Sequence, residues 1–312
     1  MNKLLIAALM TGALAVPAYA ADYTIMAPAS PGGGWDQTAR TMQEALQTEG
    51  ISGNVQVTNV PGAGGTIGLA QFVNQSAGNP DALIVGGYVM VGAVLTNMSP
   101  VTLADVTPIA RLIGEADVIV VPAASEIKTM DDLVAKLKAD PGSVSWAGGS
   151  AGGVDHIAAG LIAKAVGVDP TQINYIAYSG GGEALAAVLG SQVTVGISGL
   201  GEFASQIEAG DLRALAVTGD TAIGDIPNLK DAGVDVAVTN WRMVAAAPGI
   251  TDEQKAAISA DIEKMAQSAT WKAALETKGW TDMYMSGADF DAQLAKDIEA
   301  TSAILKDVGL VQ

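Results

Sequence analysis

The stretch Ser143-Val-Ser-Trp-Ala-Gly-Gly-Ser-Ala-Gly-Gly-Val-Asp-His-Ile157 predicts the repeating unit of this fold. Its first five residues form a short strand pattern, residues 148–155 form a glycine-rich loop, and a helical pattern follows over about 155–166. Glycine allows tight turns and a close approach of the backbone to a ligand. A strand, a loop and a helix in this order are typical of parallel α/β sheets, which bind ligands where their strands end.

The same order recurs along the chain. Strands are expected at 23–27, 54–59, 82–86, 117–121, 143–147, 173–177, 193–197, 212–217, 242–246 and 282–285. Helices are expected at about 36–49, 66–76, 129–139, 155–166, 182–190, 201–209, 252–267 and 287–307. Capping-box patterns at 129–132 and 251–254, and a similar one at 286–289, mark three helix starts. The alternation predicts an α/β protein with parallel sheets.

The length of 312 residues suggests two domains. The apolar stretches 117–122 and 239–247 are candidate hinge strands that pass between two lobes. We therefore expect lobe 1 to hold residues 21–121 and 242–312, and lobe 2 to hold residues 122–241. One continuous sheet is the alternative.

The first twenty residues have the pattern of a secretory signal peptide. Lys3 gives a positive start, residues 4–16 are apolar, and Ala18-Tyr19-Ala20 matches a cleavage signature. The apolar run is too short to span a bilayer as a helix. We expect cleavage after Ala20 and export to the periplasm, with an uncleaved anchor as the alternative.

The composition excludes several classes of function. The formal net charge is −17 without a basic stripe, which argues against nucleic-acid binding. The chain has no Cys and one His, so thiolate and multi-histidine metal sites are excluded. We expect no cofactor and no metal.

Five glycine-rich loops follow predicted strands, at 28–36, 61–66, 148–155, 179–183 and 198–202. None contains Lys or Arg, so an anion would be held there by backbone amides, hydroxyl groups and helix N-termini. Such neutral donors suit a carboxylate better than a polyphosphate. The alternative is that these loops are only tight connections. The candidate ligand-binding residues are Ser30, Gly33, Gly34, Asp36, Gly64, Gly65, Tyr88, Ser150, Gly152, His156, Ser179, Gly180 and Ser198.

Two motifs raise alternatives that the rest of the sequence disfavours. Residues 148–152 match G-x-S-x-G with Ser150 as a nucleophile, but the single His lies only six residues further on. Residues 62–68 approach the dinucleotide fingerprint, with Ile67 where its third glycine belongs. An exported serine esterase using Ser150 is the enzyme alternative, and we expect no enzyme activity.

The loops and their order resemble the solute-binding receptors of tripartite tricarboxylate transporters, the Bug or TctC family, over the whole mature chain. The matching segments are Pro31-Gly-Gly-Gly-Trp-Asp36, Asn59-Val-Pro-Gly-Ala-Gly-Gly65, Gly148-Gly-Ser-Ala-Gly-Gly-Val-Asp-His156, Tyr178-Ser-Gly-Gly-Gly-Glu-Ala184 and Leu212-Arg-Ala-Leu-Ala-Val217. Ser179 stands where many members of the family have Lys.

The resemblance implies a periplasmic binding protein of the venus-flytrap kind, type II-like, in which two α/β lobes with mainly parallel sheets close on a carboxylate. It implies first-lobe contacts at Ser30, Gly33, Gly34 and Asp36, and second-lobe contacts at Ser150, Gly152, His156, Ser179 and Gly180. The expected ligand is a di- or tricarboxylate, citrate-like first, with a C4-dicarboxylate or an aromatic carboxylate as alternatives. The expected partners are membrane permease subunits, with signalling to a sensor kinase as a further possibility, and the receptor is expected to be a monomer.

Overall fold

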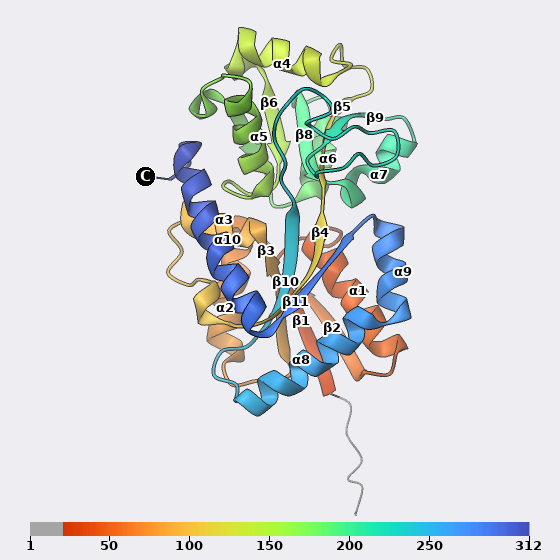
Figure 1. The fold of residues 1–312 in the computed structure, drawn as a ribbon, viewed down its shortest axis with the longest axis vertical. Helices are drawn as coiled ribbons and strands as arrows, with labels where there is room; N and C mark the ends of the chain where they lie inside the picture. Colours follow the sequence, from red (N-terminus) through yellow and green to blue (C-terminus); the bar gives the residue numbers. More distant parts are fainter. Residues whose placement is uncertain (1–20, 312) are drawn as a thin grey trace, which may run out of the picture.

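The computed structural model describes residues 21–311, which form two α/β lobes stacked end to end (Figure 1). The expected signal peptide lies outside the described residues. Each lobe is built on its own sheet, six strands in one and five in the other. The expected two-lobe α/β architecture is therefore confirmed, and the alternative of a single continuous sheet is wrong.

The first lobe contains the two ends of the described chain. Its sheet has the order β11-β4-β10-β3-β1-β2. The strands are β1 (Ala21–Ala27), β2 (Ser52–Asn59), β3 (Ala82–Gly87), β4 (Thr107–Glu115), β10 (Asn240–Ala246) and β11 (Thr281–Ser286). The helices are α1 (Gly34–Thr48), α2 (Thr66–Ser76), α3 (Tyr88–Thr96), α8 (Asp252–Gln267), α9 (Ala269–Lys278) and α10 (Gly287–Asp307), with short 3₁₀ turns at Ala63–Gly65 and Leu103–Asp105.

The second lobe is formed by the middle of the chain. Its sheet has the order β7-β6-β8-β5-β9. The strands are β5 (Asp117–Pro122), β6 (Ser145–Gly148), β7 (Asn174–Ala177), β8 (Val195–Gly199) and β9 (Leu212–Val217). The helices are α4 (Met130–Ala139), α5 (Val154–Ala165), α6 (Gly181–Leu189) and α7 (Leu200–Glu208), with 3₁₀ turns at Pro141–Ser143 and Pro170–Gln172.

Both sheets are mixed rather than mainly parallel. β1 pairs in parallel with β2 and β3, and β6 pairs in parallel with β7 and β8. The strand that enters each lobe from the other lobe runs the other way: β10 is antiparallel to β3 and β4, and β5 is antiparallel to β8 and β9. A chain that enters a lobe from its neighbour arrives at the carboxyl ends of the parallel strands, so its strand runs antiparallel to them.

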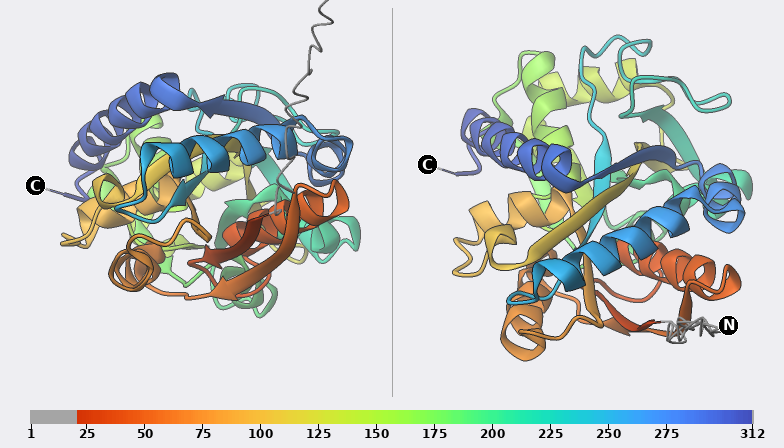
Figure 2. Two further views of the ribbon diagram at one scale, coloured as in Figure 1. Left: turned by 90° about the horizontal axis from the view of Figure 1, so that it is seen from below. Right: turned by 60° about the horizontal axis from the view of Figure 1, so that its bottom comes forward.

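The chain changes sheets at two places that lie side by side. Ala116 separates β4 of the first lobe from β5 of the second, and the segment after β9 returns to β10 at Asn240. β5 thus belongs entirely to the second sheet, several residues ahead of the boundary expected near residue 121. The C-terminal end of α10 also reaches the second lobe, where Asp307 pairs with Lys164 of α5 (Figures 1 and 2).

Three elements were missed by the sequence patterns. β4 contains Pro108 and Arg111, which interrupt its apolar run, and α9 follows α8 almost without a loop. α3 is apolar on nearly all sides, as is typical of buried helices, and therefore shows no amphipathic stripe. The capping boxes at Thr129 and Thr251 are confirmed, whereas Ser286 makes no side-chain cap at the start of α10. In the described part of the chain, no helix is long and apolar enough to cross a membrane.

Candidate ligand-binding site

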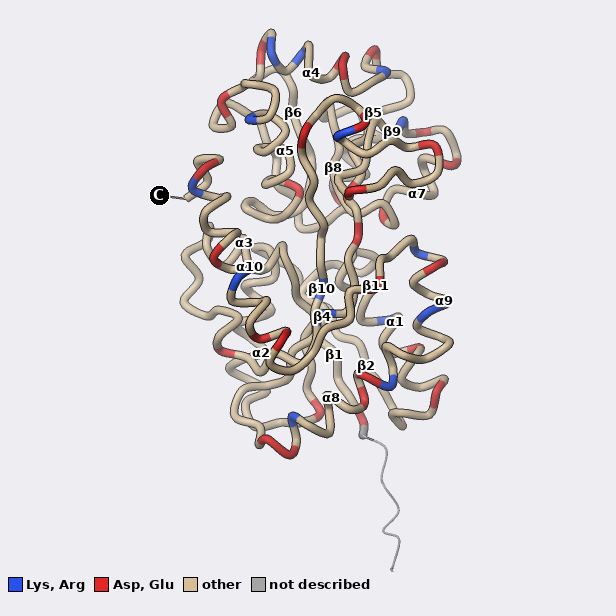
Figure 3. The backbone as a smooth tube through the Cα atoms, in the orientation of Figure 1, with Lys and Arg blue, Asp and Glu red and all other residues tan. Residues whose placement is uncertain are grey.

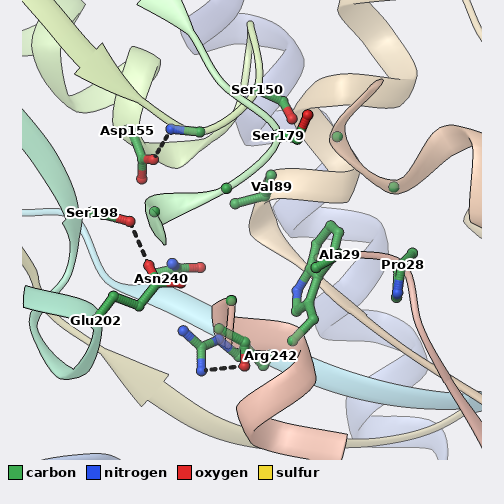
Figure 4. Close-up of a pocket in the computed structure, with 18 residues that line it drawn as sticks. Pro28, Ala29, Val89, Ser150, Asp155, Ser179, Ser198, Glu202, Asn240 and Arg242 are labelled. Atoms are coloured by element: carbon green, nitrogen blue, oxygen red, sulfur yellow. Dashed lines mark hydrogen bonds between the residues drawn. The ribbon is translucent and has the colours of Figure 1, made fainter. Parts of the chain in front are cut away.

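A cavity of about 60 Å³ lies between the two lobes, where the carboxyl ends of their parallel strands face each other (Figure 4). Its lining comes from the loops after β1, β2, β3, β6, β7 and β8 and from the start of β10. The lining residues are Pro28, Ala29, Gly33, Gly34, Trp35, Gly64, Gly65, Val89, Gly149, Ser150, Asp155, Ser179, Gly180, Gly181, Ser198, Glu202, Asn240 and Arg242.

Six helices begin around this cavity, and each has a glycine at its N-cap. None of these glycines can offer a side-chain cap, so the first N–H groups of the helices are left for other acceptors. These N-caps are Gly33 of α1, Gly65 of α2, Gly87 of α3, Gly153 of α5, Gly180 of α6 and Gly199 of α7. The positive ends of the helix dipoles add to a field that favours an anion.

Acidic residues in the first helical turns hold the glycine loops in shape. Asp36 Oδ2 accepts a hydrogen bond from the N–H of Gly32 at 2.8 Å, and Asp155 Oδ2 accepts one from Gly149 at 2.5 Å. Glu183 Oε2 accepts a similar hydrogen bond from the N–H of Ser179, in the loop before α6. Part of the amide donor capacity that the sequence suggests for a ligand is therefore used inside the loops.

The loop before α2 needs glycine at two successive positions. Gly64 and Gly65 have φ of +63° and +87°, in the left-handed region. A Cβ on Gly65 would lie 2.6 Å from the Trp35 ring, and a Cβ on Gly64 would overlap Ala93. The backbone of this loop therefore lies directly on the cavity, with Ser150 of the opposite lobe beside it.

One cation, Arg242, lies at the cavity, and it is already paired. Its guanidinium forms an ion pair with Glu115 and donates to the carbonyl oxygen of Gly34 at 3.0 Å and to Thr38 Oγ1 at 3.1 Å. Its Cζ also lies 5.4 Å from the centre of the Trp280 ring. Arg242 thus fixes the start of α1 and neutralises Glu115, in keeping with the absence of Lys and Arg from the glycine loops.

Three further carboxyl groups lie close to this pair. Burial raises the pKa of Asp155 to about 6, and burial together with the charge of Glu115 raises the pKa of Glu202 to about 7. Burial and then the charge of Asp155 raise the pKa of Asp117 well above its usual range. The floor of the cavity is therefore rich in carboxyl groups whose charge depends on pH.

His156 does not line the cavity. Its ring stacks on Tyr175 with 4.0 Å between the ring centres, and its Nδ1 accepts the N–H of Gly152 at 3.2 Å. Burial lowers the pKa of His156 to about 4, so the ring is neutral at physiological pH. This arrangement supports the loop before α5 and gives Ser150 no base of the kind that a hydrolase requires.

Eight of the thirteen predicted residues line the cavity, and five do not. Those at the cavity are Gly33, Gly34, Gly64, Gly65, Ser150, Ser179, Gly180 and Ser198. Asp36 instead bonds Gly32, Arg40 and Asn59, and although burial alone would raise its pKa, the hydrogen bonds from these partners lower it. Ser30 accepts the N–H of Gly33 in a turn, and Gly152 packs on Thr96. Tyr88 stacks on Trp241 and lines a separate pocket near α10.

The sequence analysis missed four polar residues at the cavity: Asp155, Glu202, Asn240 and Arg242. The first two are the last residues of glycine loops that were singled out, but Asp36 was the only acid of these loops among the candidates. The other two belong to β10, which only the topology brings next to β3. No group of His, Asp or Glu side chains suited to hold a metal ion occurs within residues 21–311.

The two lobes, their crossing strands and the cavity between them define a two-lobed binding protein. The model of the tripartite tricarboxylate transporter family receptor matches residues 38–310, so the chain belongs to that family. This confirms the resemblance noted in the sequence, and the chain is a periplasmic solute-binding receptor, not an enzyme.

Individual relatives agree with this membership. The chain is 26% identical to Protein BugT of Bordetella pertussis, over 96% of this chain and 94% of that protein. Among solved structures, it is similar to MatC from Rhodopseudomonas palustris with bound malate (TM-score 0.80, 20% identity, 93% and 100% of the two chains). It is also similar to another R. palustris protein, solved with adipate (TM-score 0.82, 21% identity, 92% and 97%).

Proposed function

We propose that this receptor captures a small di- or tricarboxylate between its lobes and delivers it to a tripartite tricarboxylate transporter. The observation that carries the proposal is the convergence of six glycine-capped helix starts on one cavity between the lobes. Backbone amides there provide donors for carboxylate oxygens without a free cation. The malate and adipate in the two structural neighbours support the carboxylate class.

The size of the cavity bears on which carboxylate is taken. A water needs about 10–15 Å³ of such space, so about 60 Å³ corresponds to a handful of waters. A four-carbon acid is the smallest of the expected dicarboxylates and needs the least opening of the lobes, whereas citrate, our first expectation from sequence, and an aromatic acid need more. The ligand contacts we propose are the eight predicted residues at the cavity, with the amides of Gly34 and Gly181 as donors.

Closure of the two lobes would trap the ligand. Among the hydrogen bonds that join the lobes in the described chain is one from Thr96 Oγ1 to the carbonyl oxygen of Ala151 at 3.1 Å. We propose that the lobes rotate about the two neighbouring crossings, at Ala116 and at 239–240. The predicted export and cleavage after Ala20 belong to this proposal, and the mass of the secreted protein checks them.

Isothermal titration of the mature protein with a panel of acids tests the proposal. The panel contains citrate, malate, succinate, fumarate, adipate and benzoate, and the protein is first unfolded and refolded to remove co-purified ligand. We expect one class of acid to bind with a Kd of about 0.01 to 10 μM, equivalent to roughly 7–11 kcal/mol. A refolded protein that binds none of these acids would contradict the proposed function.

Release of ligand to a permease is tested by reconstitution. Vesicles that contain the permease subunits of a tripartite tricarboxylate transporter should accumulate the bound acid only when the receptor is present. A receptor that binds the acid but does not support uptake, and instead activates a sensor kinase, would favour the signalling alternative.

A further inference from the structure

The carboxyl group of Glu202 lies at the cavity, among the groups that we propose to hold the ligand (Figure 4). It comes from the first turn of α7, in the second lobe. A Cβ on Gly181, the first residue of α6, would overlap Glu202 Oε2, and a Cβ on Gly33, the N-cap of α1, would lie 3.8 Å from Oε1. One carboxyl group of the protein therefore lies beside helix starts of both lobes.

Glu202 has no cationic partner of its own in the described chain. Its Oε2 accepts a hydrogen bond from Ser198 Oγ at 2.5 Å, whereas Oε1 has no hydrogen-bond or ion-pair partner among residues 21–311. Arg242, the cation that lines the cavity, forms its ion pair with Glu115 instead. Ionised Glu202 therefore adds a negative charge to the cavity that no ion pair cancels.

The charged groups that act on Glu202 come from three other elements. Glu115 on β4 and Asp155 on α5 disfavour its ionised form, and Arg242 on β10 favours it. Burial, followed by the charge of Glu115, raises the pKa of Glu202 to about 7. Other charged residues on elements packed against α7 make their hydrogen bonds elsewhere: Glu183 of α6 and Arg213 of β9. The proton of Glu202 therefore exchanges with solvent near neutral pH.

The second carboxyl group that lines the cavity, Asp155, is already engaged. It is hydrogen-bonded to the side chain of Asp117 on β5, and its Oδ2 accepts the N–H of Gly149 at 2.5 Å. A hydrogen bond between two carboxyl groups requires a proton on one of them, so this pair shares a proton. Of the two carboxyl groups at the cavity, Glu202 is therefore the one with a free oxygen.

A ligand carboxylate in the same cavity changes the balance at Glu202. The cavity has a volume of about 60 Å³, so a carboxylate bound at the helix starts comes close to the Glu202 carboxyl group. Two carboxylates that share a site repel each other, and the weaker acid of the two takes up a proton. Ordinary carboxylic acids are stronger acids than Glu202, so the proton goes to Glu202. The neutral Glu202 can then donate its O–H to the ligand.

We propose that Glu202 and the ligand carboxylate exclude each other as anions, so that above neutral pH the receptor takes up one proton from solvent, onto Glu202, when it binds its ligand. Glu202 thereby regulates the site: its anion competes with the ligand for the helix starts, and its neutral form admits the ligand. Capture is favoured when the surroundings are acidic, and release is favoured as the pH rises. This inference rests on the proposed function, because it requires a carboxylate in the cavity.

Calorimetric titration in several buffers measures the proton directly. The tightest-binding acid among citrate, malate, succinate, fumarate, adipate and benzoate is titrated at pH 7.5 and 8.5, where all of these acids are ionised. The dependence of the heat on the ionisation enthalpy of the buffer gives the number of protons taken up. We expect uptake of about one proton at pH 8.5, and an affinity up to about tenfold lower there than at pH 7.5.

The possible outcomes separate this inference from the proposed function. Binding without proton uptake, or with an affinity that does not fall between the two pH values, would overturn the inference and leave the proposed function standing. If none of the six acids binds the refolded receptor, the proposed function itself fails.

Substitution of Glu202 separates proton uptake from a merely structural role. Glu202→Gln keeps an acceptor for Ser198 but has no proton to gain, so at pH 8.5 we expect an affinity about tenfold higher or more, without proton uptake. Glu208→Gln, at the exposed end of the same helix, is the matched control and should keep the uptake and the pH dependence of the unaltered receptor. A Glu202→Gln variant that binds more weakly at both pH values, or that still takes up a proton, would contradict the proposed role.

Discussion

The helices that begin at the cavity start differently from those that begin on the outer surface. Six helices around the cavity have glycine N-caps without a side-chain cap. Three outer helices, α4, α8 and α9, begin with Thr129, Thr251 and Ser268, whose hydroxyl oxygens accept backbone N–H groups. The outer helices use their first amides for their own stability. The glycine-capped inner helices have no side-chain cap on their first amides, although Leu200 and Gly201 of α7 donate theirs to Ala116 and Glu115.

The contrast bears on how a strongly acidic protein would bind the proposed carboxylate. The net charge of −17 is spread over both lobes (Figure 3). At the cavity the field comes instead from oriented amides and helix dipoles, which act at short range. Local geometry rather than overall charge therefore sets the affinity, and substitutions at the two kinds of helix start should have different consequences.

The largest effect is expected where the inner helices meet across the lobes. A Cβ on Gly92 of α3 would overlap the carbonyl oxygen of Gly152, so Gly92→Ala should keep the lobes from closing. We expect ligand affinity to fall by on the order of a hundredfold, because overpacking costs up to about 3 kcal/mol. Gly182→Ala, which meets open space in α6, is the control. Calorimetric titration of both variants checks this, and equal affinities would refute a closing contact.

The next effect follows from giving an inner helix the cap of an outer one. Nothing lies within 4 Å of a Cβ on Gly180, so Gly180→Asp has room to cap α6. The new carboxylate should lower ligand affinity at least about tenfold, while the cap raises stability by a few tenths of a kcal/mol. Gly180→Asn, a neutral cap, should lower affinity less. Unchanged affinity in Gly180→Asp would mean that the ligand does not use the start of α6.

Removal of the side-chain cap of an outer helix should lower stability without changing ligand affinity. Thr251 Oγ1 accepts the N–H of Gln254 at 3.3 Å in an exposed capping box. Thr251→Ala should reduce the free energy of unfolding by about 1 kcal/mol and leave ligand affinity unchanged. Urea denaturation and titration of the same preparation measure both quantities, and a loss of affinity here would show that the two kinds of helix start are not independent.

The smallest effect concerns the pH dependence of stability. The pKa of Glu202 is raised to about 7, so the folded state holds a proton that the unfolded state releases at lower pH. Its contribution to stability is therefore lost as pH rises through 7, and the part lost between pH 6.5 and 8 is on the order of 1 kcal/mol or less. His156, whose pKa is lowered to about 4, no longer titrates in this range. Glu202→Gln should flatten the decline in urea denaturation, and an identical slope in the variant would contradict the raised pKa.

Local sequence patterns were sufficient for most elements and for the glycine loops. Each loop and the helix after it are neighbours in sequence, so glycine clusters, apolar runs and the boxes at Thr129 and Thr251 predicted them. The roles of Asp36 and His156 were not predictable in this way, because each depends on which group a side chain meets. Asp36 binds its own loop, and His156 is covered by Tyr175, a residue of the next strand.

Long-range topology accounts for what the sequence did not indicate. Arg242 and Asn240 reach the cavity because β10 lies between β3 and β4, far from both in sequence. Glu115 and Asp117 flank the first crossing between the lobes, and their partners come from the second crossing and from α5. Sequence patterns that describe one strand or helix at a time carry no information about such long-range contacts.

Glycine amide signals test the central claim most directly. Gly34 and Gly181 are the first residues of α1 and α6, and their N–H groups have no intrahelical acceptor. Their signals can be followed in an NMR spectrum of the receptor labelled with ¹⁵N at glycine. Addition of the tightest-binding ligand should shift these two signals, while those of Gly50, Gly210 and Gly279, which are outside the cavity lining, stay in place. Saturation by the ligand without any shift of Gly34 and Gly181 would contradict the account.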